Sequence, residues 1–203
     1  MCSSDLFPEL ILACEWGPVR IFQNEKGKLR ETTAALGLDK STGWWNSVAT
    51  GDFDGDGRLD IVAGNWGVNS SWHDPATQPI AVFYGDFDGN GSVDLLETET
   101  DEKGRLMPRR DLNWLGAGWP ALRTRFATHA AWSVADVPGA LGDARASAKQ
   151  LAVNSLASVI MLNRGGRFQI RRLPAEAQWS TVFGLSVADF DGDGSEDLFL
   201  AQN

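Results

Sequence analysis

A nine-residue acidic pattern occurs three times in this 203-residue chain and constrains its fold more than any other feature. The pattern is D-F-D-G-[DN]-G-x-x-D, at residues 52–60 (loop 1), 86–94 (loop 2) and 189–197 (loop 3). In a tight turn the side chains at positions 1, 3 and 5 point into one concavity, and the glycine at position 6 permits the sharp bend. The carbonyl at position 7 and the carboxylate at position 9 then close a cage of oxygen ligands. Such a cage suits a hard cation, and Ca²⁺ is the one expected.

The sequence therefore predicts up to three calcium sites. For a single copy, an acidic and glycine-rich solvated turn is the alternative, but three copies that all carry phenylalanine at position 2 favour the metal. The candidate ligands, in order of position, are Asp52, Asp54, Asp56, Arg58 and Asp60 in loop 1; Asp86, Asp88, Asn90, Ser92 and Asp94 in loop 2; and Asp189, Asp191, Asp193, Ser195 and Asp197 in loop 3.

Loop 2 also matches the pattern of an EF-hand, because Glu97 stands at position 12. An EF-hand needs flanking helices, whereas Pro79 and the apolar run 82–84 indicate a strand before this loop. Loops 1 and 3 carry Ala63 and Leu200 at position 12, so the glutamate is not part of the repeated pattern. We therefore expect loop 2 to lie between strands.

Composition limits the partners. The chain has 18 basic and 27 acidic residues, a formal charge of −9, and no basic stripe, so a nucleic-acid partner is not expected. No apolar run approaches the length of a membrane span.

Two cysteines make no disulfide framework, and Cys14 is expected to be a small buried residue. His73 is expected in a loop and His129 packed near Trp132, and neither has the spacing of a metal site or catalytic triad.

Hairpins recur with the acidic loops. Residues 19–30 and 159–170 both read as strand, Asn/Gly turn and strand, and an acidic loop follows each at a similar distance. Each acidic loop is itself flanked by β-branched and aromatic runs, as at the tip of a hairpin. We expect sheets from four groups of strands: 9–15, 18–24 and 28–34; 46–52, 59–65, 79–85 and 92–99; 150–155, 157–163 and 167–173; and 183–189 with 196–202.

A repeated four-stranded antiparallel sheet is typical of a propeller blade, so the fold class expected is all-β. Residues 119–150 break the rhythm, since they are rich in Ala, Arg and Leu and lack strand alternation. A short helical insertion is predicted there, with a turn or helix start at Asp136 and a helix over residues 139–150.

On these loops and hairpins, the chain resembles the FG-GAP/VCBS repeat family, which includes integrin α-subunit propellers and ASPIC-type proteins such as cartilage acidic protein. The resemblance covers residues 7–203, and residues 163–166, 173–178 and 187–194 are most similar to the bacterial VCBS branch. It implies a seven-bladed β-propeller in the intact protein, about four blades of it here, with calcium in the blade hairpins. It also implies an extracellular, periplasmic or cell-surface location. Residues 100–150 depart from the pattern.

Both ends of the chain look abrupt. Residues 2–6 read as one frame of a common sequencing adapter, so residues 1–6 are expected to be foreign, as at the boundary of a metagenomic read. Residues 197–203 stop within a strand pattern. We therefore expect residues 7–203 to be a propeller fragment that is truncated at both ends.

The function expected is that of an exported, non-enzymatic calcium-binding module that contacts a protein or a glycan. Nine tryptophans are many for this length, and they either pack between blades or form a recognition surface. Two alternatives stay open. One is a propeller-fold enzyme acting on polysaccharide, although no acid–base pair or nucleophile stands outside the acidic loops. The other is a purely structural repeat beside a separate functional domain.

Overall fold

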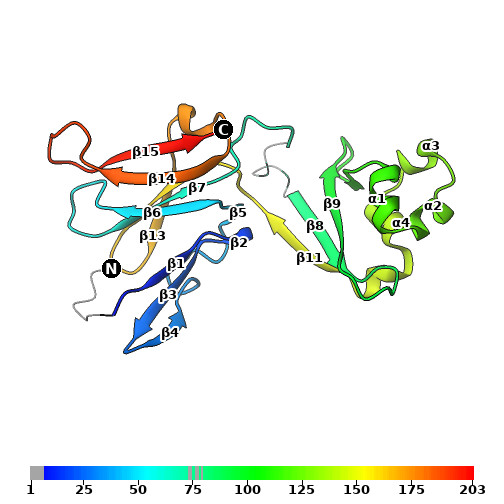
Figure 1. Cartoon of the computed structure of the whole chain (residues 1–203), viewed down its shortest axis with the longest axis horizontal. Helices are drawn as coiled ribbons and strands as arrows, with labels where there is room; N and C mark the ends of the chain where they lie inside the picture. Colours follow the sequence, from blue (N-terminus) through cyan, green and yellow to red (C-terminus); the bar gives the residue numbers. More distant parts are fainter. Residues whose placement is uncertain (1–6, 73–74, 76–77, 79) are drawn as a thin grey trace. The chain divides into compact units, whose positions relative to one another are not determined.

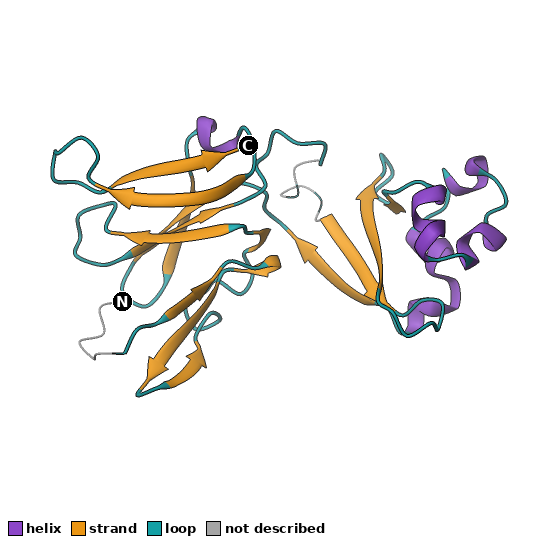
Figure 2. Cartoon of the chain, viewed as in Figure 1, coloured by secondary structure: helices purple, strands orange, loops and turns teal. Residues whose placement is uncertain are grey.

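The computed structural model describes residues 7–72, 75, 78 and 80–203, and within them strands dominate (Figures 1 and 2). The chain divides into two compact units. Unit 1 comprises residues 1–77 and 153–203, and unit 2 comprises residues 78–152. Helices of the α type occur only in unit 2 among the described residues. The expectation of an all-β fold with a helical insertion is confirmed at this level.

Unit 1 begins with a three-stranded antiparallel sheet in the order β1-β3-β4. Lys26 and Gly27 form its two-residue turn with φ of 54° and 92°, the left-handed values that a tight hairpin requires. A short pair of strands, β2 and β5, follows. The bounds are β1 Leu10–Leu12, β2 Glu15–Pro18, β3 Arg20–Glu25, β4 Lys28–Glu31 and β5 Thr42–Trp44.

A four-stranded antiparallel sheet in the order β13-β12-β7-β6 forms the centre of unit 1. Every residue of β7 is buried in it. The second hairpin of unit 1, β14 with β15, carries loop 3. The bounds are β6 Ser47–Gly51, β7 Asp60–Gly64, β12 Val159–Asn163, β13 Phe168–Arg172, the 3₁₀ helix η2 Ala175–Gln178, β14 Val182–Ala188 and β15 Asp197–Gln202.

The grouping of strands predicted from the sequence is wrong at this sheet. Strands 46–52 and 59–65 were expected to share a sheet with 79–85 and 92–99, but β7 pairs with β12, with Ala63 opposite Val159. All of unit 2 is inserted between these two partners. The pairing is non-local, and it is fixed by burial of β7 on both sides rather than by distance along the chain.

Asn65 is fully buried, and its side chain links the central sheet to neighbouring segments of unit 1. Its Oδ1 accepts hydrogen bonds from the backbone N–H groups of Trp44 at 3.1 Å and Trp66 at 2.8 Å. Its Nδ2 donates to the carbonyls of Ser155 at 3.1 Å and Ala157 at 3.2 Å. One side chain therefore holds three segments of unit 1 together. The apolar core beside the sheet consists of Val19, Ile21, Leu36, Leu38, Trp45, Ile61, Ala63, Val159 and Met161.

Unit 2 contains a second four-stranded sheet, in the order β10-β9-β8-β11, and a group of short helices. Its own core joins sheet and helices, with Leu96 and Leu122 fully buried. The strands are β8 Ile80–Gly85, β9 Asp94–Thr100, β10 Leu106–Pro108 and β11 Lys149–Val153. The helices are α1 Leu112–Gly118, α2 Ala121–Arg125, α3 His129–Trp132, α4 Val137–Leu141 and the 3₁₀ helix η1 Gly142–Ala146.

The helical region differs in its bounds from the prediction. Helix α1 starts at Leu112, before the expected insertion, because the Asp111 side chain accepts the N–H groups of Asn113 and Trp114. The helix start at Asp136 is confirmed, since that side chain accepts the N–H of Gly139 at 2.8 Å. The helix expected over 139–150 ends early, and Lys149 already begins β11, which joins the sheet of unit 2.

The tryptophans divide between core and surface. Trp45, Trp119 and Trp132 are buried in the two cores, whereas Trp114 and Trp179 are exposed.

His129 is exposed at the start of α3 rather than packed, and His73 lies outside the described residues. Cys14 is half-buried. None of the helices among the described residues combines the length and apolarity needed to cross a membrane.

Candidate metal sites

All three acidic loops connect the strands of antiparallel hairpins: β6 to β7, β8 to β9, and β14 to β15. This confirms the prediction that each loop is a hairpin tip. It also contradicts the EF-hand alternative for loop 2, since strands flank the loop on both sides. Glu97 is instead bonded to the guanidinium of Arg110 at 2.7 Å.

The loops share one set of internal hydrogen bonds. In loop 1, both oxygens of Asp52 accept backbone N–H groups, from Asp56 at 3.0 Å and Gly57 at 2.9 Å. Asp60 at position 9 accepts the N–H of Phe53 at position 2, at 3.2 Å. The same bonds recur in loops 2 and 3 at their own positions 1, 2, 5, 6 and 9. The sequence thus specifies this turn locally, by bonds that lie within nine residues.

Glycines make the turn possible. The residues at positions 4 and 6 have positive φ in every loop, for example 69° at Gly55 and 80° at Gly57. Side chains other than glycine rarely adopt this conformation without strain. The bend predicted at position 6 is therefore observed, and a second left-handed glycine precedes it.

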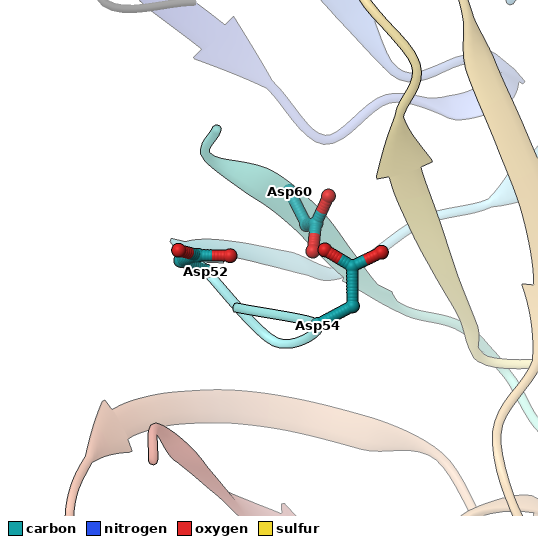
Figure 3. A group of neighbouring side chains, drawn as sticks. All are labelled: Asp52, Asp54 and Asp60. Atoms are coloured by element: carbon teal, nitrogen blue, oxygen red, sulfur yellow. The ribbon is translucent and has the colours of Figure 1, made fainter. Parts of the chain in front are cut away.

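Three carboxylates converge in each loop. They come from positions 1, 3 and 9, and one oxygen of each lies within 4.8 Å of the others. Figure 3 shows the group in loop 1, with Asp54 and Asp60 facing each other and Asp52 beside them. The members are Asp52, Asp54 and Asp60; Asp86, Asp88 and Asp94; and Asp189, Asp191 and Asp197.

Positions 5 and 7 have other contacts. The side chains of Asp56, Asn90 and Asp193 accept the backbone N–H of the residue at position 7, at 2.9, 2.7 and 2.7 Å. Asp56 and Asp193 lie outside the groups of three carboxylates. At position 7 of loop 1, the Arg58 guanidinium is bonded to Asp56.

Burial changes the proton affinity of two of these carboxyls. Asp60 is fully buried, and burial raises its pKa, although the N–H groups of Asn163 and Phe53 oppose the shift. Burial also raises the pKa of Asp94, against the hydrogen bond from the N–H of Phe87. In both, the nearby aspartates of the same loop raise the pKa further. A bound cation would favour the charged form of these groups and offset that cost.

Two residues from outside loop 1 contact it. Glu196, at position 8 of loop 3, accepts the backbone N–H of Asp52. Arg164 pairs with Asp54 at 2.7 Å and with Asp56 at 3.2 Å. Strands β6 and β14 lie side by side in unit 1, and their two loops extend from the same end (Figure 1).

Neither residue belongs to the sites predicted from the sequence. Glu196 did carry a signal, because position 8 is Leu59 in loop 1 and Val93 in loop 2. Arg164 carried none, since it is far from loop 1 along the chain.

The comparison with known families agrees with this geometry. Residues 3–63, which include loop 1, match the family model of the FG-GAP-like repeat. The chain therefore contains an FG-GAP-like repeat. Loops 2 and 3 lie outside the matched segment, yet they repeat the hydrogen bonds of loop 1. No curated protein matches the chain.

Proposed function

We propose that this chain binds calcium through its three acidic loops, as an exported and non-enzymatic β-propeller module. The observation that carries the proposal is the triad of carboxylate oxygens, built three times at the same loop positions. Carboxylates and carbonyls are the ligands that Ca²⁺ prefers, and hairpin tips leave room for its flexible coordination. The backbone carbonyl at position 7 and the side chain at position 5 would complete each site.

Bound calcium would have a structural role here. Each loop holds at least three carboxylates close together, and like charges in a small volume oppose folding. A divalent cation removes that repulsion and fixes the tip of each hairpin. The proposal predicts affinities in the extracellular range, roughly 10⁻⁴–10⁻³ M or tighter.

Isothermal titration calorimetry on the folded chain tests the proposal, combined with the substitution Asp191→Ala. This variant loses a triad ligand of loop 3, and the stabilisation linked to that site disappears. That stabilisation amounts to about 2.7 kcal/mol at a hundredfold excess of calcium over Kd. The control is Asp39→Ala, which removes an exposed aspartate outside the loops. Absence of any heat at millimolar calcium would contradict the proposed function.

The module is also proposed to contact a protein or a glycan. In unit 1, Trp44 stacks on Trp66 at 4.5 Å between ring centroids and contacts Trp16 at 5.2 Å. All three rings are only partly buried. Aromatic groups of this kind are common in recognition surfaces. Calcium-dependent binding to a glycan array, lost in Trp16→Ala, would support the glycan; hydrolysis of a polysaccharide by the purified chain would favour the enzymatic alternative.

A further inference from the structure

Loop 1 differs from loops 2 and 3 in its positive charge. Position 7 is Arg58 there, and serine in the other two loops. Its guanidinium is bonded to Asp56, and the guanidinium of Arg164 pairs with both Asp54 and Asp56. Among the described residues, no lysine or arginine forms an ion pair with a carboxylate of loop 2 or loop 3.

Arg164 is held at loop 1 by the backbone around it. It lies in the β12–β13 turn, where its N–H donates to the carbonyl of Arg167 at 2.8 Å. The preceding residue, Asn163, donates its N–H to Asp60 at 2.7 Å, and its Nδ2 to the carbonyl of Leu59 at 3.2 Å. The segment that carries the guanidinium is thus itself hydrogen-bonded to loop 1. The backbone of Arg164 is therefore held beside loop 1.

The two guanidinium groups offset part of the negative charge around loop 1. Its four aspartates, the Glu196 carboxylate beside Asp52 and the two guanidinium groups leave a formal charge of −3. Loop 2 has three aspartates, for −3, and loop 3 has four aspartates, for −4, and among the described residues neither of them has a paired guanidinium. Arginine stays protonated at every working pH, so the offset at loop 1 is permanent.

We propose that Arg164 is a tethered counter-ion of loop 1, so that this loop binds a divalent cation more weakly than loops 2 and 3 do. The inference rests on the proposed calcium binding and adds an order to the three sites. Arg164 shares the carboxylate of Asp54, a member of the triad that would otherwise face the ion, and its charge repels the ion directly.

The test isolates loop 1 in the full chain. The double variant Asp88→Ala/Asp191→Ala removes the position 3 ligand from loops 2 and 3, and calcium binding is measured by calorimetry in that background. Adding Arg164→Ala should tighten the remaining site by about two- to fivefold, the range that an exposed ion pair supports. Adding Arg167→Ala, an exposed arginine on the same turn, should leave it unchanged.

A second measurement does not depend on calorimetric affinities. In a chelating buffer, Arg164→Ala should lower the melting temperature, because Asp54 and Asp56 lose their counter-ion. Calcium should then raise the melting temperature of Arg164→Ala more than that of the unsubstituted chain. Circular dichroism at low temperature establishes that both proteins are folded.

The outcomes separate the two proposals. If the unsubstituted chain binds calcium but Arg164→Ala binds it no more tightly than the Arg167→Ala control, the counter-ion role of Arg164 is wrong and the calcium proposal stands. If neither protein responds to calcium in either measurement, both proposals are wrong. Tighter binding in Arg164→Ala alone supports both.

Discussion

Asp60 and Asp94 occupy the same position in loops 1 and 2, and burial raises the pKa of both carboxyls. Each accepts the backbone N–H of the phenylalanine at position 2, so each closes its loop as well as facing the triad. A carboxyl that accepts this hydrogen bond and also faces the triad is partly removed from water, and this burial raises its pKa. The cost of ionising it is the reason that a cation at the same point would stabilise the fold.

These shifts predict how calcium-induced stabilisation depends on pH. In the metal-free chain a raised native pKa gives a contribution to stability that is complete below the unfolded pKa, about 3.9. That contribution is lost as the pH rises through the native pKa. Because calcium binds the ionised form, the increase in melting temperature on adding calcium should grow across this interval and level off above it. Thermal unfolding with and without calcium in a pH series measures it, and a shift that is the same at all pH values would contradict the prediction.

Asn65 provides a residue-scale test of the fold. Replacing it with alanine removes four side-chain hydrogen bonds at a fully buried position, and leaves their backbone partners unsatisfied. We expect Asn65→Ala to lower the free energy of unfolding by about 2–4 kcal/mol. Asn46→Ala is the control, since the Asn46 side chain donates one hydrogen bond, to the carbonyl of Trp44 at 3.3 Å. Equal losses in urea denaturation would show that Asn65 has no special role.

At the scale of elements, the acidic hairpin is a self-contained unit whose environment nevertheless differs from copy to copy. Phe87 of loop 2 packs on Trp119 in the core of unit 2, with ring centroids 5.0 Å apart. Phe190 of loop 3 is 59% exposed and contacts Phe199 of its own hairpin at 6.5 Å. The same nine-residue turn is therefore anchored by a core in one unit and by its own strands in another.

Gly51, the last residue of β6, tests the packing of hairpin β14–β15 on β6. A Cβ at this position would lie 2.5 Å from Glu196 Oε2 and 2.9 Å from Val187 Cγ1. The Glu196 carboxylate can move away, but Val187 Cγ1 lies close to its own backbone and cannot. Gly51→Ala should therefore push β14 away from β6 and lower the free energy of unfolding by about 1–3 kcal/mol.

The matched control is Gly184→Ala in β14, where the nearest atom to the added Cβ would be Ala201 Cβ at 3.4 Å. That change should be neutral or slightly stabilising, because it only restricts the unfolded chain. If chemical denaturation shows Gly51→Ala to be as stable as this control, the close packing of Val187 on β6 is wrong.

At the scale of the whole molecule, the part of the chain that the structure describes forms two hydrophobic cores. One belongs to unit 1, with loops 1 and 3, and the other belongs to unit 2, with loop 2. Two cores of this kind can melt separately.

Calorimetry should resolve two unfolding transitions, each sensitive to the calcium sites of its own unit. With calcium present, Asp88→Ala should lower the melting temperature of the unit 2 transition only, and Asp191→Ala that of the unit 1 transition only. A single transition that both variants shift equally would contradict independent unfolding of the two units.

The acidic loops, their place at hairpin tips and the left-handed glycines could be predicted from the sequence, because the hydrogen bonds that form these turns lie within nine residues. The sequence also indicated the all-β class, since strand alternation and turn residues are local signals. The pairing of β7 with β12 and the insertion of unit 2 between them follow from tertiary packing alone. The same holds for the contact of Glu196 with loop 1 across 144 residues, and for the ion pairs of Arg164 with Asp54 and Asp56. Such contacts depend on which buried faces pack together, and no local propensity encodes that choice.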